Sequence, residues 1–181
     1  MRILGIDPGS RVTGYGIISM ERGKACHIAN GCIRTPHSDL AERLRSIFEG
    51  VSAVIEQYQP GEMAVEKVFV KRNVDSALKL GQARGAAIAA GAHRGLKLFE
   101  FTPAEVKKAI VGGGRAEKTQ IQHMIRVLLK LEERAQADAA DALALALCHG
   151  HMRETHLRIQ TSKNVLAGLR VRRYGGRGLR R

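Results

Sequence analysis

The sequence predicts an α/β domain built on a five-stranded mixed sheet. Three apolar runs near the start are separated by short links rich in turn residues, and such links join antiparallel neighbours. Two later apolar runs each follow a long helical pattern, which is typical of strands reached through crossover helices. The 181 residues, 44% of them hydrophobic, suffice for one domain with a real core.

Each element follows from the spacing of apolar residues and from the turn residues beside it. Apolar residues from Leu40 to Tyr58 recur at helical spacing until Pro60 and Gly61 end the pattern. The expected strands are residues 3–7, 14–20, 25–34, 63–66 and 97–101. The expected helices are residues 38–58, 75–93, 103–110, a stretch marked by 121–129, and 138–149, with a flexible loop at 111–115.

The helix expected at 75–93 carries a stripe of small residues. Ala77, Gly81, Gly85 and Ala89 follow one another at i+4 spacing, so they share one face. Glycine inside a helix costs about 0.5 to 1 kcal/mol relative to alanine, and the stripe therefore needs a packing reason. Packing on the domain's own sheet is one explanation, and a subunit interface is the other.

The charge of the chain indicates a polyanionic partner. Its 30 Lys and Arg against 17 Asp and Glu give a formal net charge of +13. Residues 1–150 are expected to form the folded domain, and residues 151–181 a basic, Arg/Gly-rich tail that is mobile. The tail either adds non-specific phosphate affinity or only keeps the protein in solution.

Other parts of the composition exclude several classes of protein. No run approaches the roughly 18 to 20 apolar residues of a membrane span, so a cytoplasmic location is expected. Cys26, Cys32 and Cys148 lack disulfide or zinc-ribbon spacing and are interpreted as small buried residues. His149 and His151 beside Cys148 lack a second cluster that would complete a zinc site.

Four carboxylates lie among apolar or small residues. In a strongly basic chain, acids in such positions do not serve the overall charge of the protein. They are Asp7, Glu66, Asp138 and Asp141. Burying an unpaired carboxylate costs several kcal/mol, so we expect the four to share a cation. Asp7 and Glu66 end strands that can be neighbours, and Asp138 and Asp141 are three residues apart on a helix and can face one point.

The oxygen donors and the basic surface together predict chemistry on a phosphodiester. Carboxylates suit Mg²⁺ or Mn²⁺, and two such ions can activate a water and stabilise a leaving 3′ oxygen. Each acid also has a purely structural explanation. Asp7 suits a turn, Asp138 suits a helix N-cap, and Glu66 can pair with Lys67 or Lys71.

At this point the sequence resembles a known family, the bacterial RuvC Holliday-junction resolvases. The similarity covers about residues 1–150, and the whole set of motifs, in order, is specific. The motifs are Gly5-Ile6-Asp7-Pro8-Gly9, Thr13-Gly14-Tyr15-Gly16, Val65-Glu66 with Val68-Phe69, residues 75–85, Gly112 and Gly114 before Ala116 and Lys118, Gln122-His123-Met124, and residues 137–143.

The resemblance implies a ribonuclease-H-like fold, a homodimer, and Mg²⁺-dependent endonuclease action on four-way DNA junctions. It implies paired symmetric nicks in DNA recombination and repair, a preference for a short thymine-containing sequence, and the branch-migration proteins RuvA and RuvB as partners. By position it assigns Asp7, Glu66, Asp138 and Asp141 as metal ligands.

The resemblance also implies roles for several residues near the cut. Lys107 and Lys118 match basic residues near the scissile phosphate, although both also suit solvated helix positions. Phe69 matches an aromatic residue that stacks on bases near the crossover; core packing is its alternative. Further phosphate contacts are expected from Lys71, Arg72, Arg84 and Arg115.

One segment departs from the family pattern, and three rival functions remain open. The loop at residues 131–136 lacks an expected proline and carries acids that are unusual near a metal site. The rivals are a non-cleaving module that binds branched DNA or RNA, a ribosomal-RNA-processing nuclease of related fold, and an actin-like ATPase, for which the chain is short. Four Phe, three Tyr and no Trp argue against a single-strand coating protein.

Overall fold

A computed structural model describes residues 1–36, 38–67, 74–113 and 116–174, with side chains described as far as residue 162. Its centre is a five-stranded sheet of order β3-β2-β1-β4-β5. The first three strands are antiparallel, and β4 and β5 run parallel to β1. The predicted α/β class and mixed sheet are therefore confirmed.

The elements follow the predicted order with small shifts at their ends, except that the last helix is much longer than predicted. The strands are β1 (Arg2–Asp7), β2 (Val12–Glu21), β3 (Lys24–Arg34), β4 (Glu62–Glu66) and β5 (Lys97–Phe101). The helices are α1 (Leu40–Tyr58), α2 (Val74–His93), α3 (Pro103–Val111), α4 (Lys118–Leu129) and α5 (Ala137–Tyr174).

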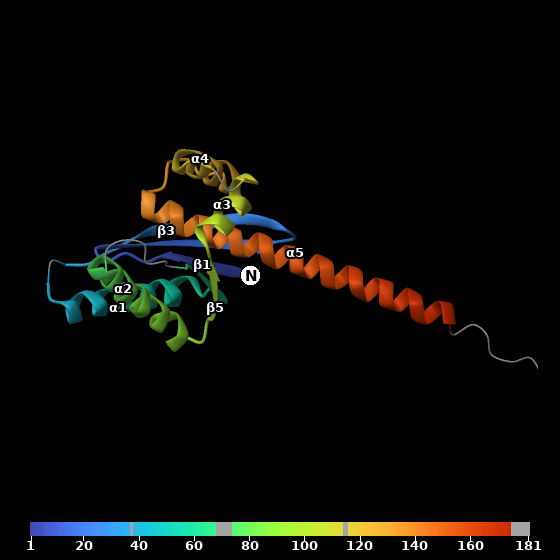
Figure 1. Cartoon of the computed structure of the whole chain (residues 1–181), viewed down its shortest axis with the longest axis horizontal. Coiled ribbons are helices and arrows are strands. Elements are labelled where there is room, and N and C mark those ends of the chain that lie inside the picture. The colour runs from blue at the N-terminus through green and yellow to red at the C-terminus, as the bar shows by residue number, and fades with distance from the viewer. Residues whose placement is uncertain (37, 68–73, 114–115, 175–181) are drawn as a thin grey trace, which may run out of the picture.

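Helices cover both faces of the sheet. Figure 1 shows α1 and α2 on one side, and α5 with α3 and α4 on the other. The alternation of side chains along β1 explains this division, because successive residues of a strand face opposite sides. Ile3 packs in the cluster that includes α5, whereas Leu4 and Ile6 pack in the cluster that includes α1 and α2. The core therefore has two layers, with the sheet between them.

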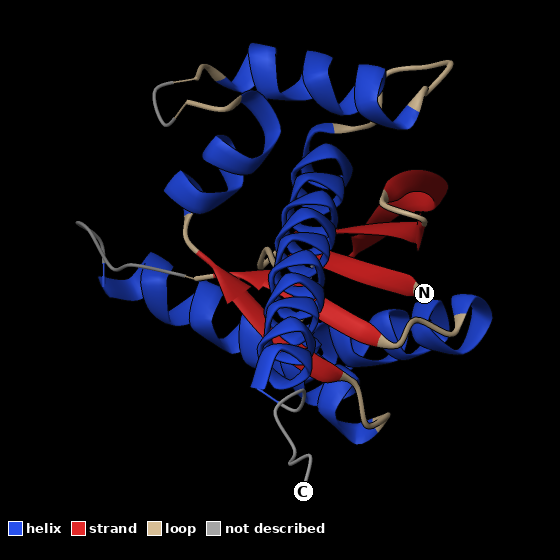
Figure 2. Cartoon of the chain, turned by 90° about the vertical axis from the view of Figure 1, so that its right-hand side faces the viewer, coloured by secondary structure: helices blue, strands red, loops and turns tan. Residues whose placement is uncertain are grey.

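Three glycines let α5 lie very close to the sheet; we call Gly5, Gly14 and Gly16 the glycine track. A Cβ atom added at Gly5 would lie 1.9 Å from the carbonyl oxygen of Ala142, and one at Gly14 would lie 2.0 Å from that of Asp138. Gly5 and Gly16 are partners in the β1–β2 ladder, so they form one strip across both strands. Figure 2 shows a long helix, α5, lying across the strands of the sheet. Any larger residue would push the helix away.

The small-residue stripe of α2 does not pack on the domain's own sheet, so the first of its two explanations does not hold. Gly81, Gly85 and Ala89 are exposed, and a Cβ at either glycine would meet nothing within 4 Å. The buried face of α2 is instead formed by Ala83, Ala87, Ala90 and Gly91. The neighbouring side chains Val74 and Leu78 are 77% and 60% exposed. The stripe therefore belongs to an exposed face with large apolar residues at one end.

The last helix is longer than the sequence predicts. It was expected to end near His149, but α5 continues to Tyr174 and extends beyond the body of the molecule in Figure 1. The division into a domain of residues 1–150 and a tail of residues 151–181 stays a prediction, and residues 175–181 lie outside the described part. Among the described residues, no helix combines the length and apolar character that crossing a membrane needs.

The prediction that all three cysteines are small buried residues is confirmed for Cys148 only. Cys148 is buried in α5, Cys32 is half-buried, and Cys26 is exposed on β3. The difference has a structural reason, because β3 is an edge strand of the sheet and has a neighbour on one side only.

Candidate active site

The first two predicted acids lie at the ends of adjacent parallel strands. Asp7 is the last residue of β1, and Glu66 is the last residue of β4. These strands pair in parallel, with Ile6 opposite Val65, so both strands end at the same edge of the sheet. Both acids are half-buried. The sheet topology therefore brings together two carboxylates that are far apart in the sequence.

The other two acids come from the first turns of α5, which the glycine track holds against this edge. Gly14 is the ladder partner of Asp7 and lies directly beneath the backbone of Asp138. Asp141 is one helical turn further along and is half-buried. Close approach of the helix to β1 and β2 thus sets the positions of Asp138 and Asp141 relative to Asp7.

A small hollow of about 170 Å³ joins most of the predicted residues. Asp7, Glu66 and Asp141 line it together with Lys107 of α3 and Lys118 of α4. Asp138 does not line this hollow, but it is close enough to raise the pKa of Asp7. Five of the six predicted catalytic residues therefore share one concave site, and the sixth lies beside it.

Burial and, after it, mutual repulsion disfavour the ionised forms of Asp7 and Glu66. Burial, followed by the charges of Asp141, Glu66 and Asp138, raises the pKa of Asp7 to about 7, against the smaller opposing effect of Lys118. Burial and the charge of Asp141 also raise the pKa of Glu66. Acids whose ionised forms are disfavoured in this way gain from a cation placed between them.

Lys118 makes a direct contact with one of these acids. Its Nζ atom donates a hydrogen bond of 2.7 Å to Oδ2 of Asp141, and this bond is the main cause of its raised pKa. Within the described residues, no three His, Cys, Asp or Glu side chains are arranged so that they could hold an ion as they lie. The donor set nevertheless suits a hard divalent cation, because every acid offers carboxylate oxygen and Mg²⁺ retains several waters when bound.

Comparisons with known proteins agree with this geometry. The family model described as crossover junction endodeoxyribonuclease RuvC matches residues 3–149. The chain belongs to the RuvC family. Proteins of that name from Stutzerimonas stutzeri and Hahella chejuensis are 58% identical over 154 residues and 54% identical over 159 residues. These matches cover 84% and 88% of this chain, and 88% and 92% of the two relatives.

A solved structure supports the same assignment. Thermus thermophilus RuvC in complex with a Holliday junction substrate has a TM-score of 0.81 and 33% sequence identity. The match covers 86% of this chain and 96% of that protein. The recognition of a RuvC-family nuclease with a ribonuclease-H-like fold is therefore confirmed. RuvC nucleases depend on metal ions.

The remaining predicted residues of this RuvC-family chain have different outcomes. Phe69, Lys71, Arg72 and Arg115 lie outside the described residues. Arg84 lies near the site, but its side chain is engaged within the protein. Its Nε donates to the backbone oxygen of Glu66 at 3.1 Å, and its guanidinium pairs with Glu100. No sequence signal indicates these contacts, because the three residues are brought together only by the fold.

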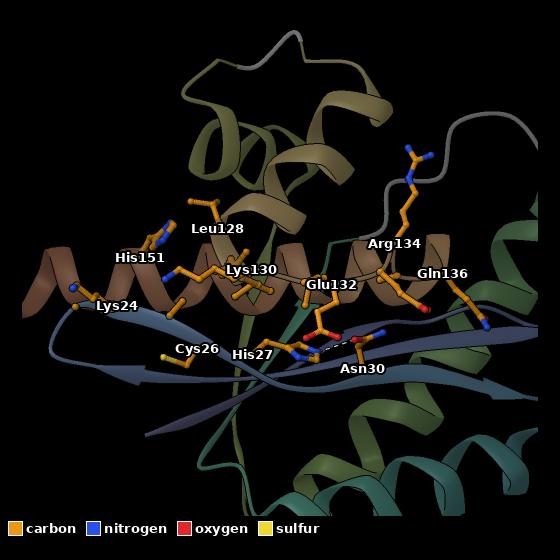
Figure 3. Close-up of a pocket in the computed structure, with 17 residues that line it drawn as sticks. Lys24, Cys26, His27, Asn30, Leu128, Lys130, Glu132, Arg134, Gln136 and His151 are labelled. Atoms are coloured by element: carbon orange, nitrogen blue, oxygen red, sulfur yellow. Dashed lines mark hydrogen bonds between the residues drawn. The ribbon is translucent and has the colours of Figure 1, made fainter.

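The unusual acidic loop of this family member lies over a different part of the fold. Figure 3 shows a groove between β3 and the segment that follows α4, with Glu132 pointing toward β3 and Arg134 above it. His27 and Asn30 on β3 face this groove and join through a hydrogen bond of 2.7 Å. Glu132 and Glu133 line this groove and do not line the hollow that holds Asp7. The acids of the loop are thus accommodated away from that hollow.

Proposed function

We propose that the protein resolves Holliday junctions by paired symmetric nicks, using Mg²⁺ at the four-carboxylate site. The observation that carries this proposal is the convergence of Asp7, Glu66, Asp138 and Asp141 at one edge of the sheet, beside two lysines. Membership of the RuvC family favours a nuclease over a non-cleaving binding module. The bound junction in the Thermus thermophilus complex favours the four-way substrate.

The four acids would hold two divalent ions, with Mn²⁺ able to replace Mg²⁺. When bound, such ions supply an activated water and stabilise charge on the leaving 3′ oxygen. The acids must lose any proton they carry before they bind metal, and the raised pKa of Asp7 makes this step sensitive to pH near 7. Lys118 and Lys107 border the same hollow and would orient the scissile phosphate.

The exposed face of α2 supports a homodimer. Val74 and Leu78 are exposed apolar side chains, and Gly81 and Gly85 next to them leave room for another backbone. A two-fold interface uses the same surface on both subunits, so one helix face is enough to form it. Two symmetric sites would match the two strands of like polarity that are cut in a four-way junction.

The DNA contacts and partners complete the proposal. Phe69 would stack on bases near the crossover, and Lys71, Arg72 and Arg115 would contact phosphates. The basic residues after 150 would add affinity that does not depend on sequence. RuvA and RuvB are the proposed partners in recombination and repair, and the site of action is the cytoplasm, where bacterial DNA lies.

The test is cleavage of a labelled four-way junction beside a linear duplex of the same sequence. We expect symmetric nicking of the junction only, only with Mg²⁺ or Mn²⁺, and none by Asp7→Asn. The variant should still bind the junction, because the basic surface is unchanged. Tight binding by the wild-type protein without cleavage under any metal condition would refute the proposal and support the binding module.

A further inference from the structure

Arg84 connects three parts of the fold at the point where Glu66 leaves the sheet. It belongs to α2, it donates through Nε to the backbone oxygen of Glu66, and it pairs with the Glu100 side chain of β5. Glu100 is the ladder partner of Val65, the residue immediately before Glu66. One guanidinium thus ties the end of β4 to both α2 and β5.

The arrangement is suited to holding geometry. A guanidinium is planar, and its donors point in fixed directions, so two simultaneous bonds fix the relative position of both acceptors. The Arg84 side chain is only 20% exposed, which limits the competition from water for these bonds. The bond to Glu66 is to its backbone oxygen, which leaves the carboxylate free to face the hollow.

The backbone near Glu66 has a second restraint on the same side. The amide of Lys67 donates to the carbonyl oxygen of Phe101 at 2.8 Å, which continues the pairing of β4 with β5 past Glu66. Arg84 adds the third element, α2, to this pair of strands. The direction in which the Glu66 side chain leaves the sheet is therefore fixed by β5 and α2 together.

We infer that Arg84 is a positioning residue for the metal ligand Glu66, acting through its backbone and held in place by Glu100. The inference rests on the proposed function, in which Glu66 binds metal. It differs from the expectation that Arg84 contacts phosphate, since a guanidinium engaged with Glu100 and the Glu66 backbone has its charge already paired. Groups that orient a metal ligand without touching the metal typically contribute about 10-fold to 100-fold to metal affinity.

The test measures Mn²⁺ binding to the protein without DNA, and electron paramagnetic resonance detects the bound ion. Affinity for the junction is measured in a separate experiment. We expect Arg84→Gln to bind Mn²⁺ about 10-fold more weakly than the wild-type protein. Arg84→Lys should also bind Mn²⁺ more weakly than the wild-type protein, because a single ammonium group cannot reproduce the two directed bonds. Glu100→Gln, which keeps Arg84 but loosens it, should show a smaller loss in the same direction. Junction affinity in EDTA should be unchanged in all three variants.

Two further variants make the result decisive. Arg94→Gln removes another arginine ion pair, the 3.1 Å contact with Glu56, without touching Glu66, and should bind Mn²⁺ like the wild-type protein. Glu66→Gln is the reference for loss of the ligand itself. If Glu66→Gln weakens Mn²⁺ binding and the Arg84 and Glu100 variants do not, the inference is wrong and the proposed function stands. If Glu66→Gln binds Mn²⁺ normally, the ligand assignment and the inference both fail.

Discussion

Replacing Asp7 by asparagine should stabilise the metal-free protein while abolishing cleavage. The asparagine side chain would resemble the protonated acid in shape, and it would remove a charge that burial disfavours and that Asp141, Glu66 and Asp138 repel. The pKa of Asp7 is raised from 3.8 to about 7, which is about three units. At about 1.36 kcal/mol per unit, the ionised carboxylate lowers the free energy of unfolding by up to about 4 kcal/mol above pH 7.

The size of this effect changes with pH in a defined window. Below the ordinary pKa of 3.8, Asp7 is protonated in both folded and unfolded chains, and the raised pKa costs nothing. As the pH rises toward 7, the unfolded chain loses the proton before the folded protein does, so the folded protein loses stability. The advantage of Asp7→Asn should therefore grow between about pH 4 and pH 7 and level off above that range.

The assay is urea unfolding in EDTA at pH 5, 6, 7 and 8. Glu49→Gln is the matched control, because Glu49 is an exposed acid of α1, on the face of the sheet opposite α5. Replacing this acid should change the free energy of unfolding little. An Asp7→Asn protein that is no more stable than wild type at pH 8, or whose advantage does not shrink toward pH 5, would refute the electrostatic reasoning.

Packing, assembly and metal binding can each be tested by one further change. Gly5→Ala should lower the free energy of unfolding by about 3 kcal/mol in urea titrations, because its Cβ would lie 1.9 Å from the carbonyl oxygen of Ala142. Gly81→Glu should convert a dimer to a folded monomer, measured by light scattering, because a charged side chain would then occupy the exposed α2 face. Mn²⁺ affinity, measured calorimetrically, should fall about tenfold per pH unit below 7, because Asp7 must lose its proton.

Each of these predictions has a control or a contrary result. Gly113→Ala, outside α2, has nothing within 4 Å of the added Cβ, so it should be about as stable as wild type. A Gly5→Ala protein of normal stability would show that α5 can lie further from the sheet. A Gly81→Glu protein that remains dimeric would place the interface elsewhere. Mn²⁺ binding that does not change between pH 6 and pH 8 would contradict the raised pKa of Asp7.

The order of elements could be predicted because it depends on local signals. Turn residues such as Pro60 and Gly61, and the apolar spacing of each segment, are visible in the sequence, and the structure places strands and helices accordingly. The length of α5 could not be predicted in this way. Beyond His149 the sequence is rich in polar and charged residues, and its apolar residues are too sparse to mark a helix by their spacing.

The candidate site also has features that could be predicted from the sequence and others that depend on the fold. The acids could be recognised because a carboxylate among small apolar residues is unusual, and Asp7, Glu66 and Asp141 do line one hollow. The role of Arg84 could not be recognised from the sequence, since its contacts with Glu66 and Glu100 depend on how α2 lies against β4 and β5. The stripe on α2 was visible in the sequence, but its orientation depends on which face packs on the sheet, and a separate row of alanines supplies that face.

The glycine track has a consequence for interpreting mutations in this protein. Two kinds of change should inactivate the protein. Loss of Asp7 removes a charge that the other acids repel. A side chain added at Gly5, Gly14 or Gly16 displaces the helix that carries Asp138 and Asp141. The first kind should melt at a higher temperature without metal, and the second at a lower one. A thermal scan of inactive variants would therefore separate defects in chemistry from defects in architecture before any DNA is cut.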